Sequence, residues 1–250
     1  MIDFEHVTKV YETQNDENVA LEDINLHIDD GEFVFVLGHS GAGKSTFLKL
    51  ILLEEKCTEG SVIINGQDIG RIKRRKVPYM RRQMGVVFQD FRLIPTMTVY
   101  ENVAFAMRVT NISSKKIKAR VPFALSLVGL EDKMDRLPDE LSGGEQQRVA
   151  VARALAHGPK IIIADEPTGN IDPEMSMDIM QLFEAINKVN ITVVVVTHEH
   201  ELVHKLAAKY NNRVITLADG MVASDTAHPE VARRYAAKVA ARSREEYDDE

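Results

Sequence analysis

The chain has 250 residues, of which 44% are hydrophobic and 28% are charged, so its body is neither disordered, nor collagen-like, nor a coiled coil. The net charge of −7 argues against a general nucleic-acid-binding protein, because contacts with phosphates call for a basic surplus. The single cysteine, Cys57, excludes an internal disulfide. The apolar runs fall far short of the roughly 18 residues that cross a bilayer, so we expect a cytosolic chain that borrows any membrane role from a partner.

Strand signals alternate with longer stretches of helical period, which is typical of an α/β protein with a largely parallel sheet. Alternating apolar and polar residues predict half-exposed antiparallel strands at 2–10, 24–28 and 61–65. Continuous β-branched runs predict strands that are buried on both faces, at 33–37, 85–88, 160–164 and 192–197. We therefore expect an antiparallel patch beside a parallel core.

Helix and turn signals complete the predicted architecture. Residues 98–130 carry no strand signal and predict a helical insertion. A helix is predicted to begin at Asp172, because Asp is a good cap and Pro173 suits the first helical position. Residues 213–217 and 221–223 flank Ala218-Asp219-Gly220 and predict a hairpin. From about residue 228 onward the chain is charged and of helical composition.

A glycine-rich stretch follows the strand at 33–37 and matches the phosphate-binding pattern G-x-x-x-x-G-K-[ST]. Glycines let backbone N–H groups turn inward around phosphate oxygens, and a helix N-terminus adds positive potential. Lys44 is predicted to reach the β and γ phosphates, and the Ser45 hydroxyl to bind Mg²⁺. The alternative is a glycine-rich turn with an exposed lysine. The residues predicted to bind the nucleotide here are Gly38, His39, Ser40, Gly41, Ala42, Gly43, Lys44, Ser45 and Thr46.

Two adjacent carboxylates, Asp165 and Glu166, end the strand predicted at 160–164. Adjacent acids at the carboxyl edge of a sheet repel each other unless a cation is present, and this edge is where open α/β folds bind ligands. We predict that Asp165 holds Mg²⁺ and that Glu166 polarises a water for attack on the γ-phosphate. The alternative is a pair of helix-capping acids.

Ser142, Gly143 and Gly144 precede a helix predicted over 145–156 and form a second phosphate-binding arrangement. One nucleotide needs one such cradle, so two cradles predict a head-to-tail pair of subunits in which each completes the other's site. The alternative is a glycine-rich cap without a ligand.

These motifs, in this order, resemble the ATP-binding-cassette (ABC) ATPases over roughly residues 1–225. The matching stretches are 38–46 (Walker A), Gln89 (Q-loop), 141–148 (signature), 161–166 (Walker B), 169–172 (D-loop) and His198 (switch histidine). The resemblance implies an α/β fold with a P-loop NTPase core and a largely parallel sheet, an N-terminal antiparallel β subdomain and a helical signature subdomain at roughly 91–157. Residues 226–250 lie outside the resemblance, and their composition predicts a charged helical tail.

The resemblance also implies roles for individual residues, with ATP and Mg²⁺ as cofactors. ATP would lie between the Walker A loop of one subunit and the signature residues of the other. The residues implied to be catalytic are Glu166 as base, His198 and Lys44, and those implied to hold the metal are Ser45, Gln89 and Asp165. Asp172 would communicate across the dimer. Tyr11 stands where the family's adenine-stacking aromatic usually lies, with a core position as the alternative.

The surrounding residues resemble a narrower group, the cell-division cassettes called FtsE, through 49–55, 81–93 and 98–104. This likeness implies an ATP-dependent homodimer, peripheral at the cytoplasmic face of the cell membrane, that works an FtsX-like transmembrane protein as a relay controlling cell-wall hydrolases, with no nucleic acid. Residues 166–170 are shared with lipoprotein-releasing and macrolide-exporting relatives, so an exporter ATPase is the alternative. Residues 91–107 are the candidate docking segment for the membrane partner, or ordinary core.

Two further patterns allow other interpretations. His200, Glu201 and His204 fit the zinc-protease pattern H-E-x-x-H, with His228 or Asp225 as a third ligand, but a protease would leave the phosphate motifs unexplained. The basic cluster within 71–82 is either a solvated face or a contact with anionic lipid headgroups. A small-molecule kinase would have no use for the second glycine cradle.

Overall fold

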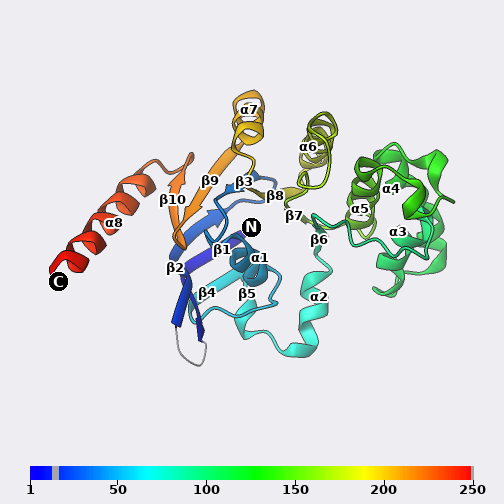
Figure 1. Ribbon diagram of the computed structural model, residues 1–250. Helices are drawn as coiled ribbons and strands as arrows, with labels where there is room; N and C mark the ends of the chain where they lie inside the picture. The colour runs from blue at the N-terminus through cyan, green and yellow to red at the C-terminus, as the bar shows by residue number, and fades with distance from the viewer. Residues whose placement is uncertain (13–16, 249–250) are drawn as a thin grey trace. The chain divides into compact units, whose positions relative to one another are not determined.

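The computed structural model describes residues 1–12 and 17–248, with side chains up to residue 241. The chain divides into two compact units, and we describe each by itself. Unit 1 comprises residues 1–29, 34–73 and 197–250, and unit 2 comprises residues 30–33 and 74–196. Figure 1 labels the helices and strands along the chain.

The elements of unit 1 are mostly strands, with a helix after the first glycine-rich loop and two helices near the C-terminus. They are β1 (Ile2–Glu12), β2 (Glu17–Ile28), β3 (Phe33–Leu37), α1 (Lys44–Ile51), β4 (Glu59–Ile64), β5 (Gln67–Asp68), η1 (Ile69–Arg71), α7 (His200–Tyr210), β9 (Arg213–Ala218), β10 (Met221–Asp225) and α8 (Glu230–Asp248). Unit 2 is built from three strands and a larger set of helices. They are η2 (Arg74–Lys76), α2 (Val77–Arg81), β6 (Met84–Val87), α3 (Val99–Arg108), α4 (Ser114–Leu127), η3 (Glu131–Lys133), η4 (Pro138–Glu140), α5 (Gly143–Leu155), β7 (Ile161–Asp165), α6 (Pro173–Asn187) and β8 (Thr192–Thr197).

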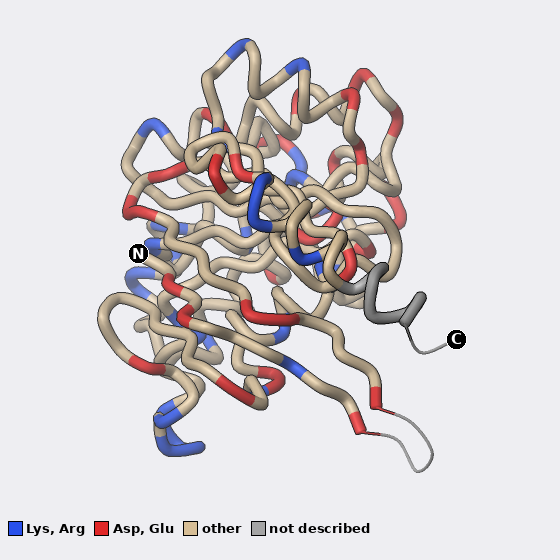
Figure 2. Tube along the Cα trace, turned by 90° about the vertical axis from the view of Figure 1, so that its left-hand side faces the viewer, with Lys and Arg blue, Asp and Glu red and all other residues tan. Residues whose placement is uncertain are grey.

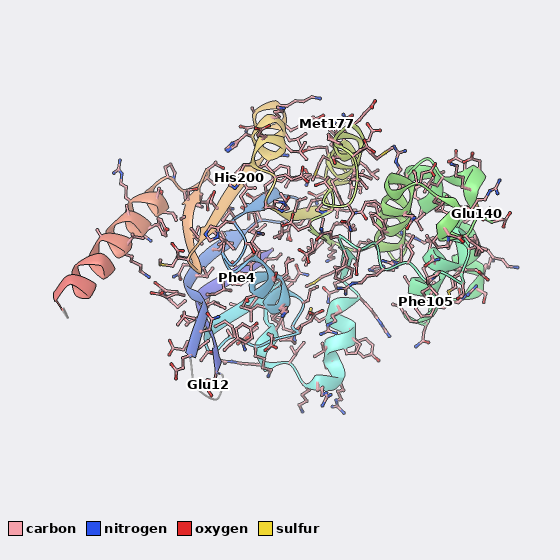
Figure 3. The ribbon with its side chains drawn as sticks, viewed as in Figure 1. Phe4, Glu12, Phe105, Glu140, Met177 and His200 are labelled. Carbon is pink, nitrogen blue, oxygen red and sulfur yellow. The ribbon has the colours of Figure 1, made fainter. Side chains whose placement is uncertain are left out.

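Unit 1 contains the predicted antiparallel sheet, in the order β2-β1-β4-β5. Its inner face carries alternating buried side chains. The ring of Phe4, which is labelled in Figure 3, stacks on Phe47 of α1 with 4.7 Å between ring centroids. β1 and β2 are longer than the strands predicted at 2–10 and 24–28, because register shifts after Phe4 and Val7 break the alternation that marks a strand. β1 ends at Glu12 and β2 begins at Glu17, and Figure 2 shows both strand ends in the colour of acidic residues.

A second set of strands in unit 1 supports the first glycine-rich loop. β3 pairs in parallel with β9, and β9 pairs antiparallel with β10, which confirms the predicted hairpin. Asp219 and Gly220 both have positive φ at its turn, as a tight hairpin of this kind requires. The first turns of α8 are tied to this unit by hydrogen bonds from Tyr235 Oη to Asp219 and from Lys238 Nζ to Asp23.

The strands β6, β7 and β8 of unit 2 pair in parallel in that order. The side chains of β7 and β8 are almost completely buried, which agrees with their continuous apolar sequence. The parallel strands of both units together with the antiparallel sheet confirm the predicted α/β class. The carboxyl ends of β6 and β7 share one edge, where Gln89 and the pair Asp165-Glu166 follow them.

Helices replace strands between residues 99 and 155, as the sequence predicted. The side chain of Thr98 caps α3, and buried Asn102 holds the preceding loop by accepting from Ile94 N at 2.7 Å. Phe105 on α3 remains 39% exposed (Figure 3). Asp172 caps α6 by accepting from Met175 N, at the predicted start. Within the described ranges no helix combines the length and the apolar character that a membrane span requires.

Candidate functional site

The loop at 38–46 joins β3 to α1 in unit 1, and its conformation depends on glycine. Gly43 has φ 99°, and a Cβ there would lie 2.7 Å from both Ala20 O and Leu21 Cδ2. A Cβ on Gly38 would lie 2.8 Å from Leu217 O. No side chain caps the start of α1. Backbone N–H groups at the start of a helix are suited to bind an anion.

Lys44 bends back over this loop. Its Nζ donates to Gly38 O at 2.6 Å and to His39 O at 3.1 Å. The next residue, Ser45, is exposed in the first turn of α1. The loop therefore presents an ammonium group, a hydroxyl and backbone donors together, which is the chemistry of a phosphate cradle.

Two other predicted residues lie in unit 1. Lys9 Nζ lies 4.7 Å from the centroid of the Tyr11 ring, and Tyr11 Oη is buried with no hydrogen-bond partner among the described residues. The proposed stacking of adenine on Tyr11 stays a prediction. His198 is exposed directly after β8, and its carbonyl accepts from His200 N at the start of α7.

In unit 2, Asp165 ends β7 and Glu166 follows with φ 46°, the left-handed region that non-glycine residues rarely adopt. Glu166 N donates to Val196 O at 2.8 Å, and Glu166 O accepts from Gly169 N at 3.1 Å. Both carboxylate residues are half-buried. Strained backbone of this kind costs on the order of 1–3 kcal/mol and clusters at functional sites.

The second glycine cradle begins α5. Ser142 Oγ accepts from Glu145 N, and Glu145 accepts in return from Ser142 N at 3.0 Å. Lys133 bonds to Glu145, and this bond, followed by the one from Ser142 N, lowers the pKa of the Glu145 carboxyl. A Cβ on Gly144 would overlap Met175 Cγ, and one on Gly143 would lie 3.5 Å from Asn170 O. The glycines therefore let α5 begin directly against the segment at 169–175.

The Q-loop residue meets the same segment. Gln89 O accepts from Asn170 Nδ2 at 2.9 Å, and a Cβ on Gly169 would lie 2.7 Å from Gln89 Nε2. Unit 2 therefore joins Gln89, the signature glycines and the D-loop in one group of contacts, close to the carboxylates at the end of β7. The loop at 38–46, Tyr11 and His198 belong to unit 1.

Sequence reasoning missed the residues that hold these loops together. Gln147, on α5, donates from Nε2 to Pro167 O at 2.6 Å, and both groups are buried. Arg153, and Asn170, which the sequence had assigned to the D-loop without a partner, bond to backbone carbonyls of the Q-loop. For Gln147 and Arg153 the available signal was a polar residue on a predicted helix, which by itself names no partner.

The structure also locates the zinc-protease pattern and the candidate docking segment. The rings of His200 and His204 lie on α7 with centroids 6.4 Å apart. In the part of the chain that the structure describes, no group of three or more His, Cys, Asp or Glu side chains is placed to hold a metal ion. In the candidate docking segment, Phe91, Leu93 and Ile94 are half-buried.

Comparison with known proteins decides the family. The family model described as "ABC transporter" matches residues 21–169. The chain belongs to the ABC transporter ATPase family. Its fold and motifs, and the activity that the motifs predicted, are those of an ATP-hydrolysing ABC cassette.

Curated relatives of this ABC ATPase are named cell division ATP-binding protein FtsE. The protein of Mycobacterium tuberculosis is 49% identical over 225 residues, which are 90% of this chain and 95% of that one. The Bacillus subtilis protein is 47% identical, covering 89% of this chain and 96% of its own length. The Escherichia coli K12 protein is 45% identical, covering 91% of this chain and all of its own length.

Solved structures of ABC cassettes share the fold. A dimer of the ATP-binding cassette MJ0796 in a post-hydrolysis state, bound to ADP and phosphate, is 39% identical, with a TM-score of 0.79 and coverage of 90% of this chain and 97% of that one. CbiO1 from Clostridium perfringens, part of the transporter complex cbiONQ, is 29% identical, with a TM-score of 0.81 and coverage of 94% and 92%.

Proposed function

We propose that this ABC ATPase is the nucleotide-hydrolysing subunit of an FtsEX-type complex, peripheral at the cytoplasmic face of the cell membrane. It would work an FtsX-like transmembrane partner as a mechanical relay that regulates cell-wall hydrolysis during division. The observation that carries this proposal is the identity of 45–49% to proteins named FtsE from three bacteria, over about nine-tenths of this chain.

The first step of the proposed cycle is binding of ATP by unit 1. The loop at 38–46 offers backbone donors at the start of α1, and Lys44 would exchange its two bonds to loop carbonyls for bonds to the β and γ phosphates. The ring of Tyr11 would stack on adenine. His198, exposed at the end of β8, would sense the γ-phosphate.

The proposed metal ligands fit magnesium by their chemistry. Ser45, Gln89 and Asp165 supply a hydroxyl, an amide and a carboxylate oxygen, and Mg²⁺ prefers such hard oxygen donors while keeping several waters and phosphate oxygens. Bound there, Mg²⁺ would neutralise charge on the β and γ phosphates.

Hydrolysis is proposed to depend on Glu166 and on a second copy of the chain. The Glu166 carboxylate would accept the proton of the attacking water, and its strained backbone is held by bonds on both sides. Ser142, Gly143 and Gly144 of the second copy would close on the triphosphate, and Asp172 would communicate between copies. The dimeric state of the MJ0796 cassette supports this arrangement.

Partner capture tests the membrane assignment. The tagged full-length chain, expressed in its own cells, is purified in mild detergent with the membrane proteins that stay bound. We expect a four-helix membrane protein with one modest outer domain. A partner with a large periplasmic or lipid-handling domain would instead identify an exporter and overturn the proposal.

Oligomeric state tests the shared site. Light scattering during size-exclusion chromatography should find Glu166→Gln as a dimer in saturating MgATP and as a monomer without nucleotide. A Glu166→Gln chain that stays monomeric in MgATP, both alone and with its membrane partner, would remove the head-to-tail arrangement.

A further inference from the structure

The Q-loop of unit 2 is strained immediately after Gln89. Phe91 and Arg92 have φ of 57° and 49°, so two consecutive non-glycine residues adopt the left-handed conformation. Phe91 N donates to Phe88 O at 3.2 Å and Arg92 N to Asp90 O at 2.6 Å, which makes two tight turns in succession. Each left-handed residue costs roughly 1–2 kcal/mol, so this loop needs support from outside itself.

Arg153 of α5 supplies that support. Its Nη2 donates to Phe91 O at 2.7 Å, and its Nη1 donates to Arg92 O. These are the carbonyls of the two strained residues. The rigid, planar fork of a guanidinium can hold two neighbouring acceptors at once, which a lysine ammonium on its flexible stem matches poorly.

The guanidinium of Arg153 lies in a partly buried place, which strengthens its hydrogen bonds to the loop. Arg153 is half-buried, and burial, followed by the charge of Arg92, lowers the pKa of its guanidinium. Arg92 itself turns away, over the Phe88 ring at 3.7 Å and toward Asp90. Both hydrogen bonds of this half-buried guanidinium go to loop carbonyls, and removing it would leave those carbonyls without their donor.

The other contacts of the Q-loop lead to the signature helix and the D-loop. Asn170 Nδ2 holds Gln89 O at 2.9 Å. Phe91 Cζ lies 3.9 Å from the place that a Cβ on Gly143 would occupy. Arg153 lies nearly three turns further along the same helix as Gly143. Helix α5 therefore contacts the Q-loop near both of its ends.

We propose that Arg153 is a positioning residue for ATP hydrolysis: its two hydrogen bonds fasten the strained Q-loop to the signature helix, so that Gln89 and Ser142 to Gly144 keep one fixed relative placement. The inference rests on the proposed roles of Gln89 and of the signature residues. Arg153 touches neither nucleotide nor metal in this scheme. Its effect is on the geometry of the groups that do.

The proposal predicts a loss of turnover without a loss of nucleotide binding. A displacement of about 1 Å in a catalytic group can cost on the order of 100-fold in rate, so we expect Arg153→Met to lower kcat by about 10- to 100-fold. The affinity of the full chain for ATP should change by less than about threefold, because the phosphate-binding loop at 38–46 belongs to unit 1. Arg153→Lys, with one compact donor group, should fall between wild type and Arg153→Met.

The experiment measures three quantities on the full chain. Steady-state ATP hydrolysis gives kcat and KM, a fluorescent ATP analogue gives nucleotide affinity, and hydrogen exchange follows the amides of residues 88–93. The matched control is Arg120→Met. Arg120 Nε donates to Ala156 O at 3.0 Å, so this variant removes a guanidinium-to-carbonyl bond beyond the C-terminus of α5 without touching the Q-loop.

We expect Arg153→Met to speed exchange in residues 88–93 and to lose turnover, while Arg120→Met keeps its turnover. Equal kcat in these two variants would overturn the proposal, and so would an analogue affinity that falls in step with kcat. If Arg153→Met does not fold, Arg153→Lys decides: wild-type kcat in that variant overturns the proposal. Glu166→Gln, assayed in parallel, distinguishes a failure of the proposed function from a failure of the inference about Arg153. If it hydrolyses ATP at the wild-type rate, the proposed site fails; if it is inactive while Arg153→Met is normal, only the inference about Arg153 fails.

Discussion

The side-chain amide of Gln147 donates to the carbonyl of Pro167 across 2.6 Å, and both groups are buried. Proline has no N–H, so this carbonyl is its only backbone polar group. The bond joins the signature helix to the residue directly after Glu166. The helix that presents Ser142 and the loop that presents Glu166 are therefore held together inside unit 2.

Replacing Gln147 with leucine should destabilise the protein, because it leaves the Pro167 carbonyl buried without its donor. The expected loss is about 1–3 kcal/mol in the free energy of unfolding, read from urea denaturation. Gln146→Leu is the control, since Gln146 makes a longer bond of 3.2 Å to Leu141 O in a partly exposed place. Equal stability of the two variants would show that the bond to Pro167 contributes nothing.

Gly43→Ala should abolish tight ATP binding. The new Cβ would lie 2.7 Å from Ala20 O and from Leu21 Cδ2, so the loop has to move away from β2. We expect affinity for an ATP analogue to fall by at least about tenfold, a cost of roughly 1.4 kcal/mol in binding free energy. Gly66→Ala is matched in backbone strain, with φ 75°, but its Cβ would meet nothing within 4 Å, and it should bind normally. Normal binding by Gly43→Ala would contradict the assigned role of this loop.

Glu166→Gln should keep ATP binding and lose most turnover, because an amide cannot accept the proton of the attacking water. A general base contributes about 10²–10⁴ in rate, so phosphate release should fall by that factor. Glu131→Gln removes a carboxylate from the exposed helix η3 and serves as the control. Rapid hydrolysis by Glu166→Gln would assign the base to another group.

Stability should fall in mild acid because of His157. Its Nε2 lies 3.1 Å from Met84 O, its buried Nδ1 has no hydrogen-bond partner among the residues that the structure describes, and burial lowers the pKa of the imidazole below the ordinary 6.5. Near pH 6.5 the unfolded chain therefore binds a proton at this histidine, while the folded chain does not bind one there until the pH is lower. Stability from the neutral ring is complete above that pH and is lost progressively as the pH falls toward the lower folded pKa.

Unfolding experiments between about pH 8 and pH 5.5 test this linkage. His157→Phe, which cannot be protonated, should show a flatter dependence of the unfolding free energy on pH than wild type. His200→Phe, at an exposed histidine, should keep the wild-type slope. An unchanged slope in His157→Phe would mean that other groups cause the acid sensitivity.

The fold was largely predictable where a local pattern encodes an element. Continuous β-branched runs predicted β7 and β8, and the capping residues Thr98, Ser142 and Asp172 stand at observed helix starts. The strands β1 and β2 were predicted too short, because their bulges interrupt the period of two on which strand prediction depends. Short-range sequence patterns therefore located the elements. Strand ends were misplaced where pairing with a distant strand, and not the local alternation, keeps the backbone extended.

The sequence by itself determined the chemistry of the candidate site, since a phosphate loop, a strand that ends in two carboxylates and a capped glycine pair are each encoded in contiguous residues. Only the tertiary structure decided which side chains hold those pieces in place. Arg153 and Phe91 are 62 positions apart, and Asn170 and Gln89 are 81 apart. A polar side chain on a helix specifies that it needs an acceptor, but the packing of distant segments selects which carbonyl becomes that acceptor.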